Sequence, residues 1–323
     1  MSYKKSFLYI ILSFFCIAIF WIIGYYLLSG IESGASKYVN DRLKIHHRIA
    51  DNIKQNKILV IGGSSVLFGV DNKYMSERLN MPVINMGSVG GLGLNYLLYD
   101  AKKSIKENDV VLLQLEYLLY DESWDIQRHQ ISTVWDNYNI DYLKSLNFYD
   151  KIKLIYGVDK YLIKNKIYTI IMGLKIIDQG IEDSKWIDEY GMIQSNTVEN
   201  SDRKKLLKSI EKRVFNNGEV LGEYKKENIK DFLSYCRSKN VKVYVTFPPY
   251  LYNKKYFDEE DERKIQKIKD FWESKNIKVI NDYTDTLYNV DDFCNSVYHL
   301  NTNGREKYTK MLIEKLKLYI NNN

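Results

Sequence analysis

The sequence predicts an α/β fold with a parallel sheet that helices cover on both faces. Two observations lead to this class. Short runs that are apolar on both faces, as buried parallel strands are, occur at residues 57–61, 82–85 and 109–115. Helical segments alternate with such runs, and after a long interruption the alternation resumes with helix 227–239, strand 241–247, helix 259–273, strand 277–280 and a last helix from 304 to 319.

The composition is that of a folded protein. Of the 323 residues, 45% are hydrophobic and 27% are charged, which excludes global disorder. The formal net charge is +6, and its densest basic stretch contains Lys204, Lys205 and Lys208 at the spacing of an exposed helix face. Because no nucleic-acid-binding motif accompanies these lysines, we expect no nucleic-acid partner.

No set of residues has the spacing of a metal site. Cys236 and Cys294 lie far apart without a CxxC pattern, so a structural zinc site is not predicted, while a bridge between them stays open for an oxidising compartment. The adjacent His46 and His47 point to different faces of a helix and lack a third ligand. We interpret them as a surface pair, and we predict no metal and no cofactor.

An N-terminal membrane anchor is predicted at residues 1–28. Residues 7–28 contain no charge, and as a helix they would measure about 33 Å, which matches a hydrocarbon core of ~30 Å. Trp21, Tyr25 and Tyr26 suit an interfacial aromatic belt. A cleaved signal peptide is the alternative, but the run is longer than an ordinary h-region and no A-x-A site follows it.

The charges near the N-terminus predict the membrane topology, and the order of the predicted strands and helices predicts the domains. Lys4 and Lys5 favour a cytoplasmic N-terminus, which makes the chain a single-pass protein of the cell membrane with its main domain outside. We expect a juxtamembrane stalk at 29–56 and one domain at 57–323. Residues 121–222 interrupt that domain as a mostly helical insertion, for which a lid or acceptor site and a packing subdomain are equal alternatives.

Chemically distinctive residues follow the predicted strands at their carboxyl ends, where open α/β sheets place their sites. Ser64, Gly90 and Glu116 each follow one of the first three strands, and His299 precedes the last helix. A serine in a tight glycine turn suits a nucleophile, because the backbone turns sharply and the next helix offers free N–H groups to an oxyanion. A serine and a histidine brought together this way suit nucleophilic catalysis. The alternatives are a plain strand–helix connection and a phosphate-binding turn, but neither glycine loop carries a Lys or Arg.

Three stretches resemble the SGNH/GDSL hydrolase superfamily, and in particular its membrane-anchored bacterial branch. They are Ile-Gly-Gly-Ser-Ser-Val-Leu-Phe-Gly-Val-Asp at 61–71, Asn-Met-Gly-Ser-Val-Gly at 85–90 and Tyr-His-Leu-Asn-x-x-Gly at 298–304. The chain is similar in them to the D-alanyl-lipoteichoic-acid transfer protein and to polysaccharide O-acetyl-processing proteins. The resemblance implies a flavodoxin-like, three-layer α/β/α fold.

The resemblance also implies roles for individual residues. Ser64 would be the nucleophile, with Ser65 as the second choice, and His299 would be the general base. The backbone amides of Gly90 and Ser65 would form the oxyanion hole.

The chain departs from the superfamily at two places. Glu116-Tyr117 stands where an oxyanion-hole asparagine is usual, and because a carboxylate would repel an oxyanion we assign Glu116 and Tyr117 to substrate binding. Asn295 stands near the position of the usual aspartate before the histidine. We expect Asn295 to orient His299, with Asp292 as the alternative.

These patterns lead to two functional hypotheses. The first is an anchored serine esterase or O-acyltransferase that acts on acyl groups of a cell-envelope or capsular polysaccharide. Its partners would be an acylated glycan or acyl donor, the membrane and, as the resemblance implies, a membrane-bound O-acyltransferase. The second is an inactive relative that binds glycan or scaffolds an envelope assembly system, which the two departures favour.

Overall fold

The computed structural model describes residues 3–34, 36–124, 126–137, 139–173, 183–210, 214–215, 218–253 and 257–320. The chain divides into two compact units. Residues 1–37 and 128–177 form the first, called here the anchor unit, and residues 38–127 and 178–323 form the second, called the sheet unit.

The sheet unit is built on five parallel strands in the order β2-β1-β3-β4-β6. Every residue of the first three strands is buried, as expected where helices cover both faces. The prediction of a parallel α/β sheet is therefore confirmed. The strands are β1 (Ile58–Gly62), β2 (Val83–Asn85), β3 (Val110–Gln114), β4 (Lys242–Val245) and β6 (Lys278–Val279), and a separate parallel pair consists of β5 (Tyr250–Leu251) and β7 (Leu287–Tyr288).

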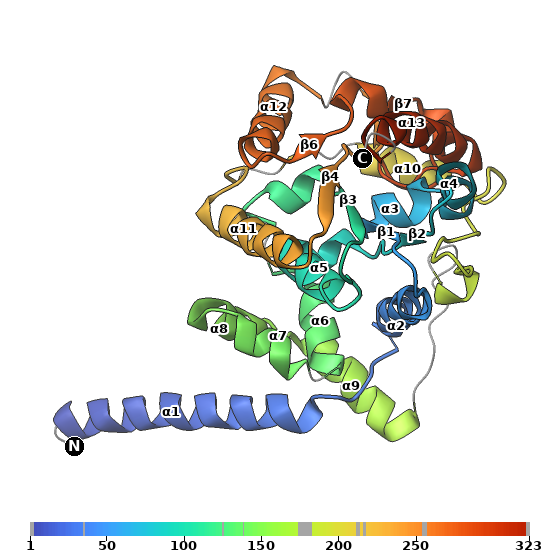
Figure 1. Ribbon diagram of the computed structural model, residues 1–323. Helices are drawn as coiled ribbons and strands as arrows, with labels where there is room; N and C mark the ends of the chain where they lie inside the picture. Colours follow the sequence, from blue (N-terminus) through green and yellow to red (C-terminus); the bar gives the residue numbers. More distant parts are fainter. Residues whose placement is uncertain are drawn as a thin grey trace. The chain divides into compact units, whose positions relative to one another are not determined.

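The helices around the sheet form two packed groups. Helices α5 and α11 contact each other, whereas α3 and α4 contact α13. Figure 1 shows the first group on one side of the sheet and the second on the other. These and the remaining helices of the unit are α2 (Lys37–Asn52), α3 (Ser64–Gly69), α4 (Asn72–Leu79), α5 (Gly93–Ala101), α10 (Arg203–Ile210), α11 (Glu223–Ser238), α12 (Glu259–Ser274) and α13 (Thr302–Ile320).

Helix α5 ends at Ala101, before the turn that leads into β3. The reason lies in the side chain of Asp109, which accepts the backbone N–H of Lys106 at 2.8 Å and also binds the buried ammonium of Lys57 at 2.7 Å. These bonds stabilise a turn just before β3, so the chain leaves the helix to enter the strand.

Helix α2 lies within the segment 29–56, for which the sequence predicts a juxtamembrane stalk. It buries Val39, Leu43, His46 and Ala50, so most of it is an integral helix of the sheet unit. The apolar residues recur at helical spacing, which is the pattern of a helix with one packed face.

The anchor unit contains the predicted membrane anchor. Helix α1 (Tyr3–Leu28) is long and apolar enough over Lys5–Leu28 to cross a membrane, and Met1 and Ser2 lie outside the described residues. The segment 121–222 is divided between the units, with helices α6 (Arg128–Asp136), α7 (Ile140–Ser145), α8 (Phe148–Tyr156) and α9 (Lys160–Met172) in the anchor unit. Residues 183–210 belong to the sheet unit.

Candidate active site

The glycine turn after β1 brings Ser64 to the first position of α3. Side chains would not fit in this turn, because a Cβ on Gly62 would collide with the carbonyl oxygen of Gln114 and one on Gly63 with the carboxylate of Glu116. Ser64 is half-buried, whereas Ser65 is fully buried and its Oγ accepts a 3.3 Å hydrogen bond from Gln114 Nε2. Of the two serines, Ser64 is therefore the one that a substrate could reach.

Glu116 holds the backbone of this turn. Its two carboxylate oxygens accept the N–H of Gly63 at 3.0 Å and the N–H of Ser65 at 2.7 Å. The side chain is only 4% exposed, and burial raises the pKa of Glu116 above its ordinary value, although the bonds from Ser65 and Gly63 oppose the shift. A carboxylate thus satisfies N–H groups that have no partner inside helix α3.

These contacts bear on three of the predicted roles. Both oxygens of Glu116 accept N–H groups of the turn, which is the arrangement of a residue that positions the turn. The Ser65 amide already donates to Glu116, so it is not available to an oxyanion. Tyr117 is fully buried and packs against Phe247 and Tyr250, which makes it part of the core instead of the substrate site.

The loop after β2 packs closely on α3. Asn85 Nδ2 donates to the carbonyl oxygen of Val66 at 3.0 Å, and Ser88 N–H donates to that of Gly62 at 3.2 Å. Gly90 is the first residue of a 3₁₀ turn, where backbone N–H groups lack a partner within the turn, and a Cβ added to it would meet nothing within 4 Å. Its carbonyl oxygen accepts a 3.2 Å bond from the indole of Trp124. A side chain at Gly90 would thus extend into open space.

His299 lies against α3. Its ring stacks on the ring of Phe68, with centroids 4.2 Å apart and an interplanar angle of 14°. Phe68 follows Ser64 by four residues, so the two share a face of α3, one turn apart. The ring packing therefore holds the His299 loop beside the face of α3 that begins with Ser64.

Asn295 is the partner of the imidazole. Its Oδ1 lies 2.7 Å from Nδ1 of His299. Because a carbonyl oxygen only accepts, Nδ1 carries the hydrogen, and Nε2 has the lone pair of a general base. The alternative, Asp292, instead pairs with Lys307 at 2.6 Å.

The motif around His299 has a structural explanation. Cys294 N–H donates to the carbonyl oxygen of His299 at 2.8 Å, which closes the loop that carries Asn295. Asn301 Oδ1 accepts the N–H groups of Asn303 and Gly304 at 3.0 and 3.2 Å, so Asn301 caps α13.

Asn196 is a supporting residue that the sequence analysis missed. It is fully buried, and its Nδ2 donates to the carbonyl oxygens of Phe68 at 3.0 Å and Leu300 at 2.7 Å. Its Oδ1 accepts from the buried guanidinium of Arg305 at 2.8 Å. One amide therefore joins the end of α3 to the His299 loop and to α13. No local sequence pattern marks this role, because all three partners are distant in the chain.

A second serine–histidine–aspartate set corrects the interpretation of His46 and His47 as a surface pair. His47 lies 2.6 Å from Ser104 Oγ and 2.9 Å from Asp100 Oδ2. Ser104 has no exposed surface, so these contacts fasten α2 to the end of α5 and offer no accessible nucleophile. His46 is buried against the carbonyl oxygen of Gly191 at 2.9 Å, and burial lowers the pKa of His46 to about 3.

Cysteines and metal ligands add nothing to the site. Cys236 and Cys294 are both buried and free, so the bridge that the sequence left open is absent. Within the described ranges, no group of three or more His, Cys, Asp or Glu side chains could hold a metal ion.

Comparison with known proteins gives only a distant likeness. No protein-family model matches the chain, and no curated protein matches it. Among solved structures, it is similar to one described as "a putative platelet activating factor from Streptococcus pneumonia". That alignment covers 93% of this chain and 99% of the other, with 12% identity and a TM-score of 0.38. Similarity at this level defines neither a family nor an activity.

Proposed function

We propose that the protein is a membrane-anchored serine esterase or O-acyltransferase that acts on acyl groups of a cell-envelope or capsular polysaccharide. The observation that carries the proposal is the placement of His299 against α3, with Nδ1 held by Asn295 and the ring stacked on Phe68, one turn from Ser64. The sheet order corresponds to 2-1-3-4-5, the order of flavodoxin-like folds, and it supports the SGNH-like assignment.

In the proposed reaction, Nε2 of His299 takes the hydroxyl proton of Ser64 as Oγ attacks the carbonyl carbon of an ester. The amides of Gly90 and Ser64 stabilise the oxyanion, in place of the Ser65 amide that Glu116 occupies. When the tetrahedral intermediate collapses, the proton passes from His299 to the departing alkoxide and an acyl-Ser64 ester remains. Water or a sugar hydroxyl then attacks that ester, which gives hydrolysis or transfer.

The contacts of α1 support an uncleaved anchor over a signal peptide. The indole of Trp135 donates to the carbonyl oxygen of Tyr25 at 2.8 Å, and the two rings stack with centroids 5.7 Å apart. Gly30 N–H donates to the carbonyl oxygen of Trp135 at 2.9 Å. A helix that is removed from the mature protein has no need of specific contacts with it. We propose a cytoplasmic N-terminus and an extracytoplasmic main domain, with a membrane-bound O-acyltransferase as a candidate partner.

One observation favours a second function, an inactive SGNH-like protein that binds glycan or scaffolds an envelope polysaccharide assembly system. Glu116 replaces a neutral oxyanion donor with a buried carboxylate beside Ser64 and occupies the amide of Ser65. A negative charge at this position opposes the charge that develops on an oxyanion.

A fluorophosphonate probe distinguishes the two functions. The full-length protein in detergent is treated with the probe, and the modified residue is located by mass spectrometry in wild type, Ser64→Ala, Ser65→Ala and His299→Ala. Activated serine chemistry predicts labelling that disappears in Ser64→Ala, falls in His299→Ala and persists in Ser65→Ala. A folded wild type that takes up no label would favour the scaffold function, and label lost only in Ser65→Ala would overturn the choice of nucleophile.

A further inference from the structure

Helices α8 and α9 of the anchor unit present an unusually apolar surface. Outside α1, most of the large hydrophobic side chains that are exposed in the described residues lie between residues 148 and 172. Soluble surfaces rarely gather so many, and such patches generally mark an interaction site. The members are Phe148, Tyr149, Ile152, Tyr156, Tyr161, Ile167, Tyr168, Ile170, Ile171 and Met172.

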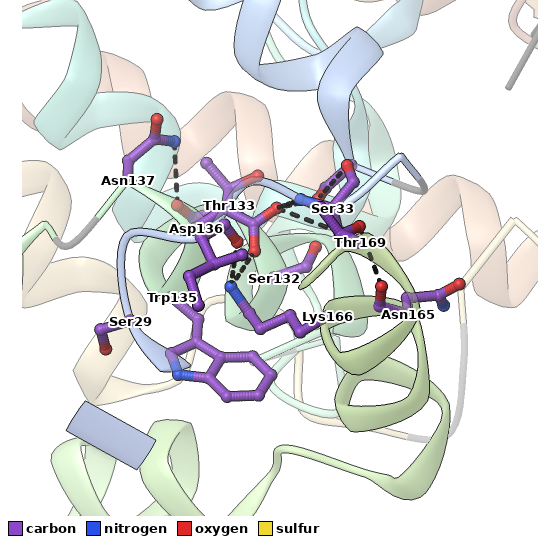
Figure 2. Close-up of polar contacts among 12 residues, drawn as sticks. Ser29, Ser33, Ser132, Thr133, Trp135, Asp136, Asn137, Asn165, Lys166 and Thr169 are labelled. Carbon is purple, nitrogen blue, oxygen red and sulfur yellow. Dashed lines mark hydrogen bonds and ion pairs between the residues drawn. The ribbon is translucent and has the colours of Figure 1, made fainter. Parts of the chain in front are cut away.

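Helix α9 buries a charged side chain and exposes apolar ones, which is the reverse of a surface helix in a soluble protein. Its buried face contains Lys166, whose ammonium lies 2.6 Å from the carboxylate of Asp136 and 4.3 Å from the ring centroid of Trp135. Asp136 also accepts the N–H of Ser33 at 3.1 Å, so the ion pair fastens α9 to α6 and to the segment that follows α1 (Figure 2). With the charge of Lys166 held inside, Ile167, Ile170 and Ile171 of α9 are exposed.

The same surface lies beside the last turns of α1. The indole of Trp21 donates to the carbonyl oxygen of Ile155 in α8 at 3.2 Å. An almost wholly apolar cavity of about 340 Å³ lies between these last turns of α1 and the chain that leads into α9, with Tyr25 and Leu28 on one side and Val158 and Ile167 on the other. Trp21 is seven residues from the end of α1, about 10 Å along the helix axis. If α1 spans a bilayer, α8 and α9 meet it where headgroups and acyl chains join.

The charges of the segment match an anionic lipid surface. Lys160 and Lys164 are exposed among the aromatic and aliphatic side chains, and the Lys153 ammonium lies 4.5 Å from the ring centroid of Tyr149. The acidic side chains are engaged within the unit, because Asp150 binds Asn147 at 2.8 Å and Asp159 caps α9 and pairs with Arg128. Lysines interleaved with tyrosine and isoleucine are typical of helices that lie in the membrane interface.

We infer that α8 and α9 form an interfacial membrane-binding surface, which seats the anchor unit on anionic lipid in addition to the span of α1. The ligand is the boundary layer of the bilayer, with apolar side chains among the acyl chains and lysines at the phosphates. This inference rests on the proposed anchor role of α1, and it is independent of the chemistry at Ser64.

The test measures the depth of single labelled positions in the full-length protein. Cys16 is replaced by serine, and an environment-sensitive NBD fluorophore is attached in separate variants to Phe148→Cys, Ile171→Cys and, as a water-exposed control in the sheet unit, Glu273→Cys; Cys236 and Cys294 are buried. The proteins are reconstituted in nanodiscs of phosphatidylglycerol and phosphatidylcholine. Quenching by aqueous iodide is compared with quenching by lipids that carry a doxyl group close to the headgroup.

We expect lipid-borne quenching at Phe148 and Ile171 and iodide quenching at Glu273. Iodide quenching of all three positions, equal in extent, would overturn the inference and indicate a surface that faces water or a protein partner. Labels at Ile152 and Tyr168 on the same surface repeat the test if one variant does not fold. Failure of the wild type to remain with liposomes after an alkaline carbonate wash would instead refute the anchor itself, so the two failures are distinguishable.

Discussion

Glu116 is the buried carboxylate behind the glycine turn at Ser64, and its replacement tests the contacts of that turn directly. Glu116→Ala leaves the N–H groups of Gly63 and Ser65 buried without an acceptor. An orphaned buried donor costs about 1–3 kcal/mol, so the two together cost about 2–6 kcal/mol of unfolding free energy. Glu116→Gln keeps one acceptor oxygen and turns an NH₂ group toward the second N–H donor. The loss of that one hydrogen bond costs about 1–3 kcal/mol of unfolding free energy.

Thermal unfolding of the full-length protein in detergent measures this effect. For a unit of this size, about 2 kcal/mol corresponds to roughly 4–8 °C in the unfolding midpoint. The matched control is Glu107→Gln, because Glu107 is exposed and precedes the same strand, β3. The rate of fluorophosphonate labelling at Ser64 is recorded in parallel, and we expect it to fall with the geometry of the turn. Unchanged midpoints and labelling in both Glu116 variants would refute the positioning role.

The pH dependence provides a second arm of the same test. Burial raises the folded-state pKa of Glu116, so between the ordinary value of 4.5 and that raised value the folded protein binds more protons than the unfolded chain. The contribution of Glu116 to stability is therefore complete below pH 4.5 and decreases as the pH rises through this window. Because glutamine does not titrate, the difference in unfolding free energy between wild type and Glu116→Gln should shrink over the same window. A difference that grows with pH would refute the assignment.

Three other variants test the remaining contacts. Asn295→Asp places a negative charge beside His299 and should accelerate labelling of Ser64, whereas Asn295→Leu should slow it. The acceleration should not exceed about 10⁴-fold, which is the rate lost when the equivalent aspartate of a serine protease is replaced. Gly90→Pro removes the backbone N–H at the first position of a 3₁₀ turn, where proline is tolerated because the preceding Val89 is extended. It should lower the acylation rate about 10²- to 10³-fold relative to the control Gly90→Ala, which keeps that N–H. Lys166→Met leaves Asp136 buried and unpaired and should destabilise the anchor unit by about 3–5 kcal/mol in thermal unfolding, whereas adding Asp136→Asn should restore much of the loss.

The sheet and the turns that carry the candidate residues could be predicted because they depend on local signals. Strands β1 and β3 are short apolar runs, and their observed limits differ from the predicted ones by a residue or so. Likewise, the turn at Ser64 and the loop at His299 follow from glycine and asparagine positions that the local backbone requires. The approach of Asn295 to His299 was predictable from their spacing along one loop.

What the sequence did not predict depends on contacts between distant residues. From the sequence we assign Glu116 to substrate on the ground that a carboxylate repels an oxyanion, because no local pattern shows that its oxygens accept N–H groups from another loop. Asn196 has no local signature either, because its Nδ2 donates to the carbonyl oxygens of distant residues. Histidine is a polar residue, so the sequence favours a surface position for His46, yet its hydrogen bond to the carbonyl oxygen of Gly191 allows burial. The orientation of α9 also depends on a distant contact, because the ion pair of Lys166 with Asp136 determines which face is buried.

Asn295 and Glu116, which depart from the expected motifs, differ in charge from the residues expected there, while other contacts hold the candidate site. Two unlike interactions hold the His299 loop against α3: a ring stack on Phe68 and the amide of Asn196, which spans the carbonyl oxygens of Phe68 and Leu300. Within the loop, Asn295 holds the imidazole of His299. Each joins residues next to the proposed nucleophile or base, which is where small displacements are costly to a reaction. Asn295 removes a charge from the base, and Glu116 adds one behind the turn. The missing charge at the base should slow acylation without moving the reacting groups, so on the proposed function the charge-restoring Asn295→Asp variant should be faster than the wild type.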